Sequence, residues 1–199
     1  MRLDDGSGGG YKAKVDENYR LHTEGVVRDT LREGVYQGKA FNFNTGAMTL
    51  TSANESAVGY FKYDGDDPFI IEEILFILGA TTGGSGDGTA KIIKNPTGGT
   101  IVTNAVPIEV AQNRDFSSQL AVEGDTFKGA EGYTTTGGST FADTTRSSFG
   151  TVIAFDAASI ILRKGNSLAC TWTPPSGNTS QSVKIAATGY ISGSDVFAD

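Results

Sequence analysis

The sequence predicts an all-β protein, an antiparallel β-sandwich of jelly-roll type with an extended N-terminal arm. Apolar and polar residues alternate with a period of two through most of the chain from residue 39 onward, as they do in half-buried strands. Clusters of Gly, Asn, Asp and Pro interrupt these runs, as turns interrupt antiparallel strands. Glycine is abundant, with 27 residues in 199, nearly twice the usual share of about 7%. Most of these glycines fall between the apolar runs, where tight turns need them.

The length of the chain fits one domain. A single β-sandwich or barrel can run to roughly 200–250 residues, and a chain of 199 residues can bury about 70% of its unfolded surface without disulfides. We therefore expect a flexible arm over residues 1–18 and one sandwich domain over residues 19–199.

The arm begins with a polar tract that cannot bury enough surface to fold alone, DDGSGGG at residues 4–10. Two interpretations stay open: a disordered terminus, or an arm that orders against a neighbouring subunit. In the second interpretation Tyr11 and Tyr19 are the anchors, because aromatic side chains give a large contact area at a small entropy cost. Lys12 and Lys14 complete this predicted contact.

The stretch after the arm shows two patterns. Residues 19–23 alternate like a strand, whereas Val27, Leu31 and Val35 are spaced like one face of a helix. We expect a strand to about Arg28, followed by a short helix or a loop.

From residue 39 onward the alternation predicts ten strands. The clearest case places Phe41 and Phe43 on one face of a strand, with Asn42 and Asn44 on the other. The expected strands cover residues 39–43, 47–51, 56–63, 69–82, 89–94, 106–111, 149–155, 159–162, 167–173 and 181–191.

The strand expected over residues 69–82 is the longest. Its early alternation gives way to a continuous apolar run over residues 74–80. This run predicts a strand buried on both faces, with a subunit interface as one way to bury it. A helix is the alternative, but the DGDDP entry at residues 64–68 and the β-branched residues favour a strand.

A polar stretch rich in Gly, Thr and Ser spans residues 124–148. Loops longer than about 12–15 residues tend to be functional or disordered. Because the stretch contains Phe127, Tyr133 and Phe141, we expect a loop that contacts a partner protein. The alternative is a long surface loop without such a role.

Charge and cysteine usage narrow the function. The net charge of −7, from 16 basic and 23 acidic residues, argues against nucleic-acid binding. The longest apolar run is far shorter than the about 20 residues that span a bilayer. The first residues show no apolar signal segment, so we expect synthesis and folding in a cytoplasm. Cys170 is the only cysteine and His22 the only histidine, so we expect a buried thiol rather than a Cys/His nucleophile.

Two segments resemble known calcium-binding motifs, but neither matches its motif in full. GGSGDG at residues 83–88 differs from the calcium-binding nonapeptide repeat, because its Asp is the fifth residue and not the sixth. The segment also occurs once, whereas that repeat binds calcium as a stack of several copies. DGDD at residues 64–67 fails as an EF-hand loop, because Phe69 and Leu75 occupy the places of its Gly and Glu. A solvated turn is the expected structure there, with a loosely bound cation as the alternative. One His and one Cys cannot supply a zinc site. We expect no catalytic residue, no cofactor and no metal, and hence not an enzyme.

A carbohydrate-binding β-sandwich module is one alternative function, because such modules present aromatic side chains on a sheet face. The commoner role of these side chains is packing in a core or an interface. The aromatic residues in question are Tyr60, Tyr63, Tyr133, Trp172 and Tyr190.

Several turn-rich segments carry a family resemblance through their order. They are GKAFNFNTGAMTLT at residues 38–51, NES at 54–56, NPTGGTIV at 95–102, NRDF at 113–116, FKGAEG at 127–132 and GNTS at 177–180. This set, over residues 38–190, resembles a family of virion structural proteins of tailed bacteriophages. Jelly-roll capsid decoration (cement) proteins are similar in size and composition.

The resemblance implies a structural protein that decorates and stabilises a capsid. It implies a homotrimer on the capsid surface, with the major capsid protein and its own copies as partners. A tail, fibre or baseplate component is the other location that the resemblance allows.

Overall fold

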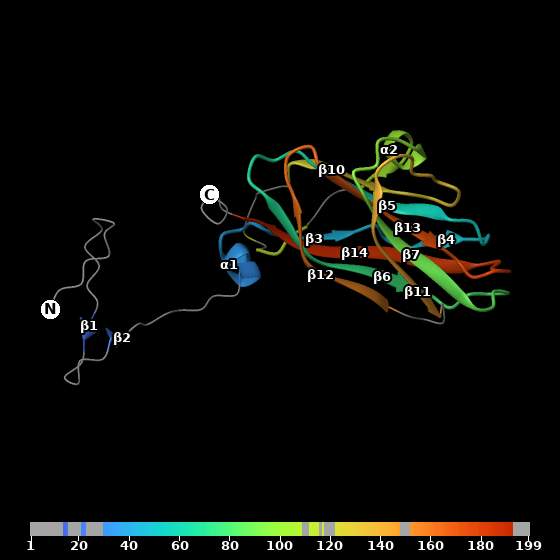
Figure 1. Ribbon diagram of the computed structural model, residues 1–199, viewed down its shortest axis with the longest axis horizontal. Helices are drawn as coiled ribbons and strands as arrows, with labels where there is room; N and C mark the ends of the chain where they lie inside the picture. Colours follow the sequence, from blue (N-terminus) through green and yellow to red (C-terminus); the bar gives the residue numbers. More distant parts are fainter. Residues whose placement is uncertain are drawn as a thin grey trace.

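The computed structural model describes residues 14–15, 21–22, 30–108, 112–115, 117, 122–147 and 152–192. Two antiparallel sheets pack face to face in this part of the chain, as Figure 1 shows. The predicted all-β class with antiparallel sheets is therefore confirmed.

We name each sheet after its central strand. The β14 sheet runs in the order β12 (Val152–Leu162), β6 (Phe69–Leu78), β14 (Gln181–Ile191), β3 (Ala40–Asn44) and β9 (Gln112–Asn113), and β4 (Met48–Leu50) also pairs with β14. The β13 sheet runs in the order β11 (Ser139–Ser147), β7 (Asp87–Lys94), β13 (Ser167–Thr173), β5 (Ser56–Tyr63), β10 (Gly124–Lys128) and β8 (Val106–Pro107). Two helices, α1 (Thr30–Tyr36) and α2 (Thr100–Thr103), and a pair of two-residue strands, β1 (Lys14–Val15) and β2 (Leu21–His22), complete the described elements.

The chain crosses repeatedly between the two sheets. β5, β7, β11 and β13 belong to one sheet, whereas β6, β12 and β14 belong to the other. Strands that are adjacent in a sheet therefore come from distant parts of the sequence, and β13 pairs with both β5 and β7. Such pairing depends on long-range contacts rather than on local hairpins.

Three predicted strands, over residues 56–63, 167–173 and 181–191, have the observed bounds. The strands expected over residues 149–155 and 159–162 form one strand, β12, with a register shift between Asp156 and Ile160. Of the two alternatives after the arm, the short helix is observed as α1.

The prediction of a loop over residues 124–148 is wrong, because this stretch contains β10 and β11. β11 lies at the edge of its sheet, where a strand needs only one buried face and can carry polar residues. The expected burial of the strand over residues 69–82 on both faces is found within the chain as far as Ile71, and its burial in a subunit interface beyond that residue stays a prediction. There Ile74 and Phe76 are buried and Leu75 and Ile77 only partly so, because α1 covers the outer face of this sheet near β14 and β3.

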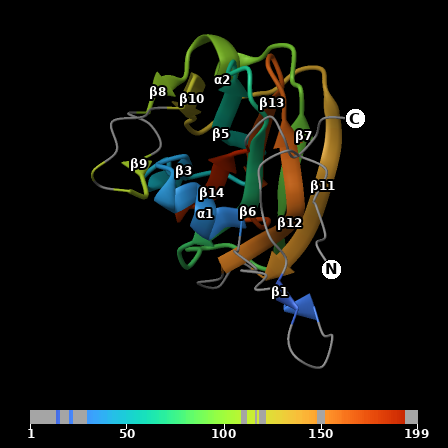
Figure 2. The same ribbon diagram turned by 90° about the vertical axis from the view of Figure 1, so that its left-hand side faces the viewer.

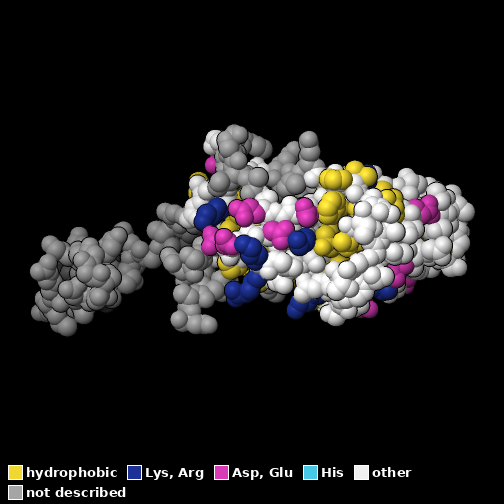
Figure 3. Space-filling model, turned by 90° about the horizontal axis from the view of Figure 1, so that it is seen from above, with side chains coloured by type: hydrophobic (Ala, Val, Ile, Leu, Met, Phe, Trp, Pro, Cys, Tyr) yellow, Lys and Arg dark blue, Asp and Glu magenta, His cyan; other side chains and the backbone are white. Residues whose placement is uncertain are grey.

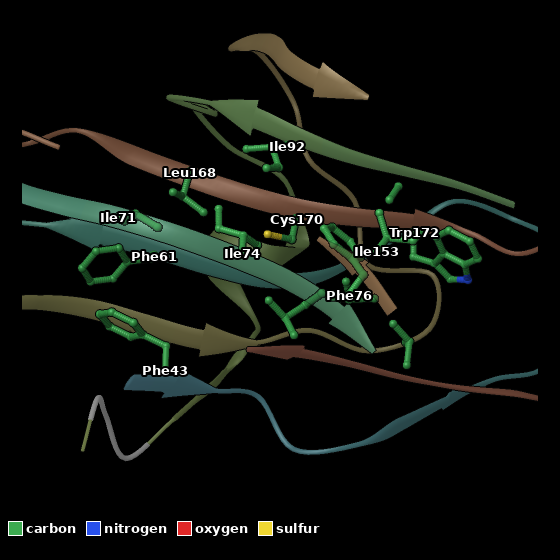
Figure 4. Packing of buried hydrophobic residues seen from close by; sticks show 14 of the residues in the cluster. Phe43, Phe61, Ile71, Ile74, Phe76, Ile92, Ile153, Leu168, Cys170 and Trp172 are labelled. Carbon is green, nitrogen blue, oxygen red and sulfur yellow. The ribbon is translucent and has the colours of Figure 1, made fainter. Parts of the chain in front are cut away.

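The main core lies between the sheets (Figure 4). Phe43 and Phe61 have ring centroids 4.6 Å apart, and the ring of Phe69 meets that of Phe43 edge-on at 5.6 Å. Aromatic pairs of this kind stabilise a fold by about 0.5–1.5 kcal/mol beyond the contribution of their buried apolar area. Cys170 lies in the same core, as predicted, and burial raises the pKa of its thiol to about 12.

A smaller hydrophobic cluster lies on the outer face of the β13 sheet. Ile101 of α2 is fully buried there against Ala57, Tyr60 and Ala169. α2 and the chain just after β10 therefore form a partial third layer over the sheet. This layer leaves part of the outer face uncovered, next to β7 and β11.

Candidate functional site

The candidate site is the side of the sandwich where the β13 sheet ends with β11 and the β14 sheet ends with β12. Among the described strands, β11 pairs only with β7, and β12 pairs only with β6. The two strands lie side by side at this boundary in both ribbon views (Figures 1 and 2). Within the described part of the chain each is therefore unpaired on its outer side, and such an edge offers backbone donors and acceptors to another chain.

A β-bulge interrupts each of these edges. In β11, Thr140 pairs with Ile93 and Ala142 with Ile92, which leaves Phe141 as the extra residue. β12 has its register shift between Asp156 and Ile160. Bulges re-aim side chains and twist an edge away from simple strand addition. This surface is therefore suited to side-chain packing more than to extension of a sheet.

Apolar side chains are exposed beside the bulges. Phe141 is 54% exposed and lines a groove of about 270 Å³ with Ile161, which is 39% exposed. Val152, 56% exposed, lines a neighbouring cleft of about 620 Å³. Three of the five large hydrophobic residues that are exposed in the described chain lie on β11 and β12, the other two being Tyr36 and Val106. We call this region the edge surface and define it by the exposed Phe141, Val152 and Ile161 together with the partly buried Ile160.

The charge beside the edge surface differs from that of the whole chain. Lys94, Asp143 and Arg146 line its two hollows, whereas the chain carries a net charge of −7. Two acidic copies can approach here with less repulsion than over an average part of their surface.

The predicted interface residues are not all described by the structure. Tyr11, Lys12 and Tyr19 lie outside the described residues, and the side chain of Lys14 in β1 does too. Phe141 is on the edge surface. The structure brings Phe127 and Tyr133 together elsewhere, in the cluster on the outer face of the β13 sheet.

Phe127 and Tyr133 make their main described contacts within the chain. The ring of Phe127 stacks on Tyr60, with centroids 5.8 Å apart. The hydroxyl of Tyr133 donates a hydrogen bond to the carbonyl oxygen of Asn104 at 3.0 Å. Both residues are only partly buried, and their role as contacts to another protein stays a prediction.

Sequence reasoning missed Val152 and Ile161. The sequence VIAFDAASIIL of β12 carries apolar residues on both faces, which is a usable signal for a strand that meets something on each side. Which of these residues stay exposed depends on the strand lying at the edge of its sheet, and that follows only from the strand order.

Three asparagines in the resembling segments fasten turns. Asn44 Oδ1 accepts a hydrogen bond from the N–H of Gly46 at 2.8 Å. Asn95, with a left-handed φ of 48°, accepts one from the N–H of Ser167 at 2.9 Å through Oδ1. Asn178 is buried and donates through Nδ2 to the carbonyl oxygen of Leu50 at 3.0 Å. These segments therefore hold together loops that join different strands.

The acidic turn over residues 64–67 is paired with lysines. Lys62 Nζ lies 3.1 Å from Asp64 Oδ1, and Lys164 Nζ lies 2.6 Å from Asp66 Oδ1. Figure 3 shows basic and acidic side chains intermingled on the face seen from above, beside a group of hydrophobic ones.

Within the described ranges, no three His, Cys, Asp or Glu side chains are grouped to hold a metal ion. The described helices include none that is long and apolar enough to cross a membrane.

Most of the aromatic residues considered for sugar binding are in fact buried. Tyr60, Tyr63, Trp172 and Tyr190 are inside the fold, where they cannot stack on a ligand. Tyr133 alone of the five is partly exposed. A sugar site built on the other four is therefore excluded.

Comparison with known proteins adds no family. A scan against protein-family models finds no match, and a search of curated proteins finds none either.

Proposed function

We propose that the chain is a non-enzymatic structural protein of a tailed-phage virion, which decorates and stabilises the capsid as a homotrimer. The edge surface is the observation that carries the proposal. It combines two free but bulged strand edges with exposed apolar side chains and a locally balanced charge.

The strand order supports the jelly-roll form of this proposal. Within the β13 sheet, β13 lies between β5 and β7, and within the β14 sheet, β14 lies between β3 and β6. Two sheets whose strands alternate along the chain in this way are what two interleaved Greek keys produce. Jelly rolls are a recurrent architecture of viral shell proteins.

The physical demands on a shell protein also fit this chain. An acidic surface keeps it soluble before assembly. Closed symmetry then lets one patch of each copy meet a patch of the next, and weak contacts add up by multivalency on the particle. The major capsid protein is the partner to which such a trimer attaches.

Sedimentation equilibrium tests the trimer directly. We expect the wild-type chain to sediment as a trimer, and the double variant Phe141→Asp, Ile161→Asp as a monomer. Tyr36→Asp is the matched control, because Tyr36 is 67% exposed but lies on α1 and lines neither hollow of the edge surface. A wild-type monomer, or a double variant that stays trimeric, contradicts the proposed interface.

Fractionation tests the location in the particle. Heads and tails are separated from particles of the phage that encodes the chain, and each fraction is analysed by mass spectrometry. The proposal requires the chain in the head fraction, whereas the tail fraction favours the tail, fibre or baseplate alternative. Deletion of residues 1–18 is expected to reduce occupancy on the capsid and to leave the circular dichroism spectrum of the sandwich unchanged.

A further inference from the structure

A further hollow lies on the outer face of the β13 sheet. It has a volume of about 350 Å³ and opens between the sheet and the chain that leads into β11. Its size falls at the lower end of the range of small-ligand sites, which starts at about 300 Å³. We call it the outer-face cleft. Its lining includes Glu55, Lys91, Tyr133, Thr135, Thr140 and Thr171.

The lining of the outer-face cleft contains an ion pair that a threonine hydroxyl holds in place. Lys91 Nζ lies 3.0 Å from Glu55 Oε2, and Thr171 Oγ1 donates a hydrogen bond to Glu55 Oε1 at 2.6 Å. Burial acts to raise the pKa of Glu55, but the bonds from Thr171 and Lys91 outweigh it and lower the pKa. The carboxylate is therefore ionised at neutral pH, and the pair carries no net charge.

Both members of the pair keep unused hydrogen-bonding capacity. A carboxylate has about four acceptor positions and an ammonium three donors. The side chains are 41% exposed for Glu55 and 30% exposed for Lys91. Each can therefore still bond a ligand in the cleft while the pair stays intact.

Further hydroxyls surround this pair. Thr135, Ser139 and Thr140 line the cleft. Their side-chain hydroxyls form no hydrogen bond with any residue that the structure describes. Tyr133 borders the same cleft, and its own hydroxyl is fixed on the carbonyl oxygen of Asn104. A rigid ring thus lies next to a set of unused donors and acceptors.

The wall of the cleft has a defined shape. Gly137 and Gly138 form it with left-handed φ values of 68° and 75°. A Cβ at Gly138 would lie 2.5 Å from the carbonyl oxygen of Lys94, so the chain approaches β7 as closely as it does only with glycine there. The hydroxyl-bearing residues on either side of this turn are therefore held in place before any ligand binds.

We propose that the outer-face cleft binds a neutral saccharide through adjacent hydroxyls. A pair of neighbouring sugar hydroxyls can donate to Glu55 and accept from Lys91, and such charge-assisted bonds are stronger than neutral ones. Tyr133 offers an apolar ring flank for a sugar face. An anion would meet Glu55 and a cation would meet Lys91, so a neutral polyhydroxylated ligand fits the paired charges best. This inference is independent of the proposed virion role and applies to a head or a tail protein.

An array of neutral glycans probed with the full-length chain tests the proposal first. Methyl glycosides of glucose, galactose, mannose and N-acetylglucosamine are then titrated and followed by ¹⁵N–¹H NMR. We expect binding with shift changes at Thr135, Thr140 and Thr171. The proposal is overturned if the array gives no signal and the NMR spectrum shows no shift at about 10 mM glycoside. Such a result would mean that the binding free energy is weaker than roughly 3 kcal/mol.

Variants separate the cleft from other surfaces. Glu55→Gln and Thr140→Val are each expected to weaken binding at least about tenfold, a loss equivalent to 1.4 kcal/mol. Asp64→Asn is the matched control, because Asp64 is also 41% exposed and paired with a lysine, yet does not line the cleft; its affinity should be that of the wild type. Should Glu55→Gln fail to fold, Thr140→Val decides alone, since it changes no charge. Binding that both cleft variants leave unchanged overturns the assignment.

Discussion

Trp172 and Gln181 form a buried polar contact inside an otherwise apolar core. Trp172 Nε1 donates a hydrogen bond to Gln181 Oε1 at 2.9 Å, and Gln181 Nε2 donates to the carbonyl oxygen of Gly79 at 3.1 Å. The glutamine thus joins β13 in one sheet to the end of β6 in the other. A buried donor without an acceptor costs more than a typical hydrogen bond contributes, so this contact favours one alignment of the two sheets.

Replacing Gln181 by Leu is expected to lower the free energy of unfolding by about 1–3 kcal/mol, because the indole N–H of Trp172 loses its acceptor. Urea denaturation followed by tryptophan fluorescence measures the loss for the single variant. In a Trp172→Phe background, followed by circular dichroism, the same change should cost about 1 kcal/mol less. Equal losses in both backgrounds would show that the indole bond contributes nothing.

Two glycines in strand interiors differ in what surrounds them. A Cβ at Gly189 would lie 2.5 Å from the carbonyl oxygen of Ile70, whereas a Cβ at Gly59 would meet nothing closer than 3.4 Å, at Thr45. Gly59 also lines a small apolar cavity of about 40 Å³. The first position has no room for a methyl group, and the second has.

We therefore expect Gly189→Ala to destabilise the fold by about 1–3 kcal/mol through overpacking. Gly59→Ala should be neutral or should stabilise it by about 0.4–1 kcal/mol, because alanine restricts the unfolded chain. Thermal unfolding of the two variants side by side gives the comparison. Similar losses for both would mean that glycine at position 59 is required for another reason.

At the scale of the strand, β11 depends on its bulge. Phe141 is the extra residue between two regular pairs with β7, so its deletion leaves the residues on either side in register. The result would be a longer regular edge, and such edges promote aggregation.

Deletion of Phe141 is thus expected to increase aggregation measured by light scattering, with little change in the melting temperature of the soluble fraction. Phe141→Ser is the control, since it removes the same apolar side chain but keeps the bulge, and it should aggregate less than the wild type. If the two variants behave alike, the side chain rather than the bulge determines association.

The elements also show what could be read from the sequence. The sequence predicts β5, β13 and β14 with their observed bounds, because these interior strands carry closely spaced apolar residues and end at turn residues. The sequence predicts a loop at β11, because Phe141 and Ala142 are the only apolar residues in this strand and do not alternate with its Ser, Thr, Asp and Arg residues. The bulge at Phe141 leaves no mark in the sequence.

The sites depended on topology for the same reason. Glu55 meets Lys91 and Thr171 only because β13 pairs with both β5 and β7. No local pattern joins these three residues. The edge surface likewise requires β11 and β12 to be the outermost strands of different sheets.

At the scale of the molecule, Cys170 reports on the whole sandwich. It lies in β13, between β5 and β7, with the other sheet packed over it. Reagents reach a thiol in this position only when the sheets separate, so its labelling should follow global unfolding. The single cysteine makes the signal unambiguous.

The buried thiol also sets a pH dependence. The pKa of Cys170 is raised by burial from 9.0 to about 12, so its neutral form stabilises the folded state. That contribution is fully present below the unfolded pKa of 9.0 and is lost as the pH rises toward the folded pKa of about 12. Over this window the free energy of unfolding should fall by up to about 1.4 kcal/mol for each pH unit.

Comparison with Cys170→Ala isolates this effect from tyrosines and lysines, which titrate in both proteins. The wild type should lose its stability more steeply than the variant between pH 9 and 11 in urea unfolding, and the two curves should run parallel at pH 6–8. Labelling of the wild-type thiol by a disulfide reagent in the absence of denaturant should be slower than in the unfolded chain by the factor that its unfolding free energy implies. Fast labelling of the folded protein would show that the sandwich opens locally around β13 without unfolding as a unit. Parallel stability curves throughout would show that folding does not raise the pKa of Cys170.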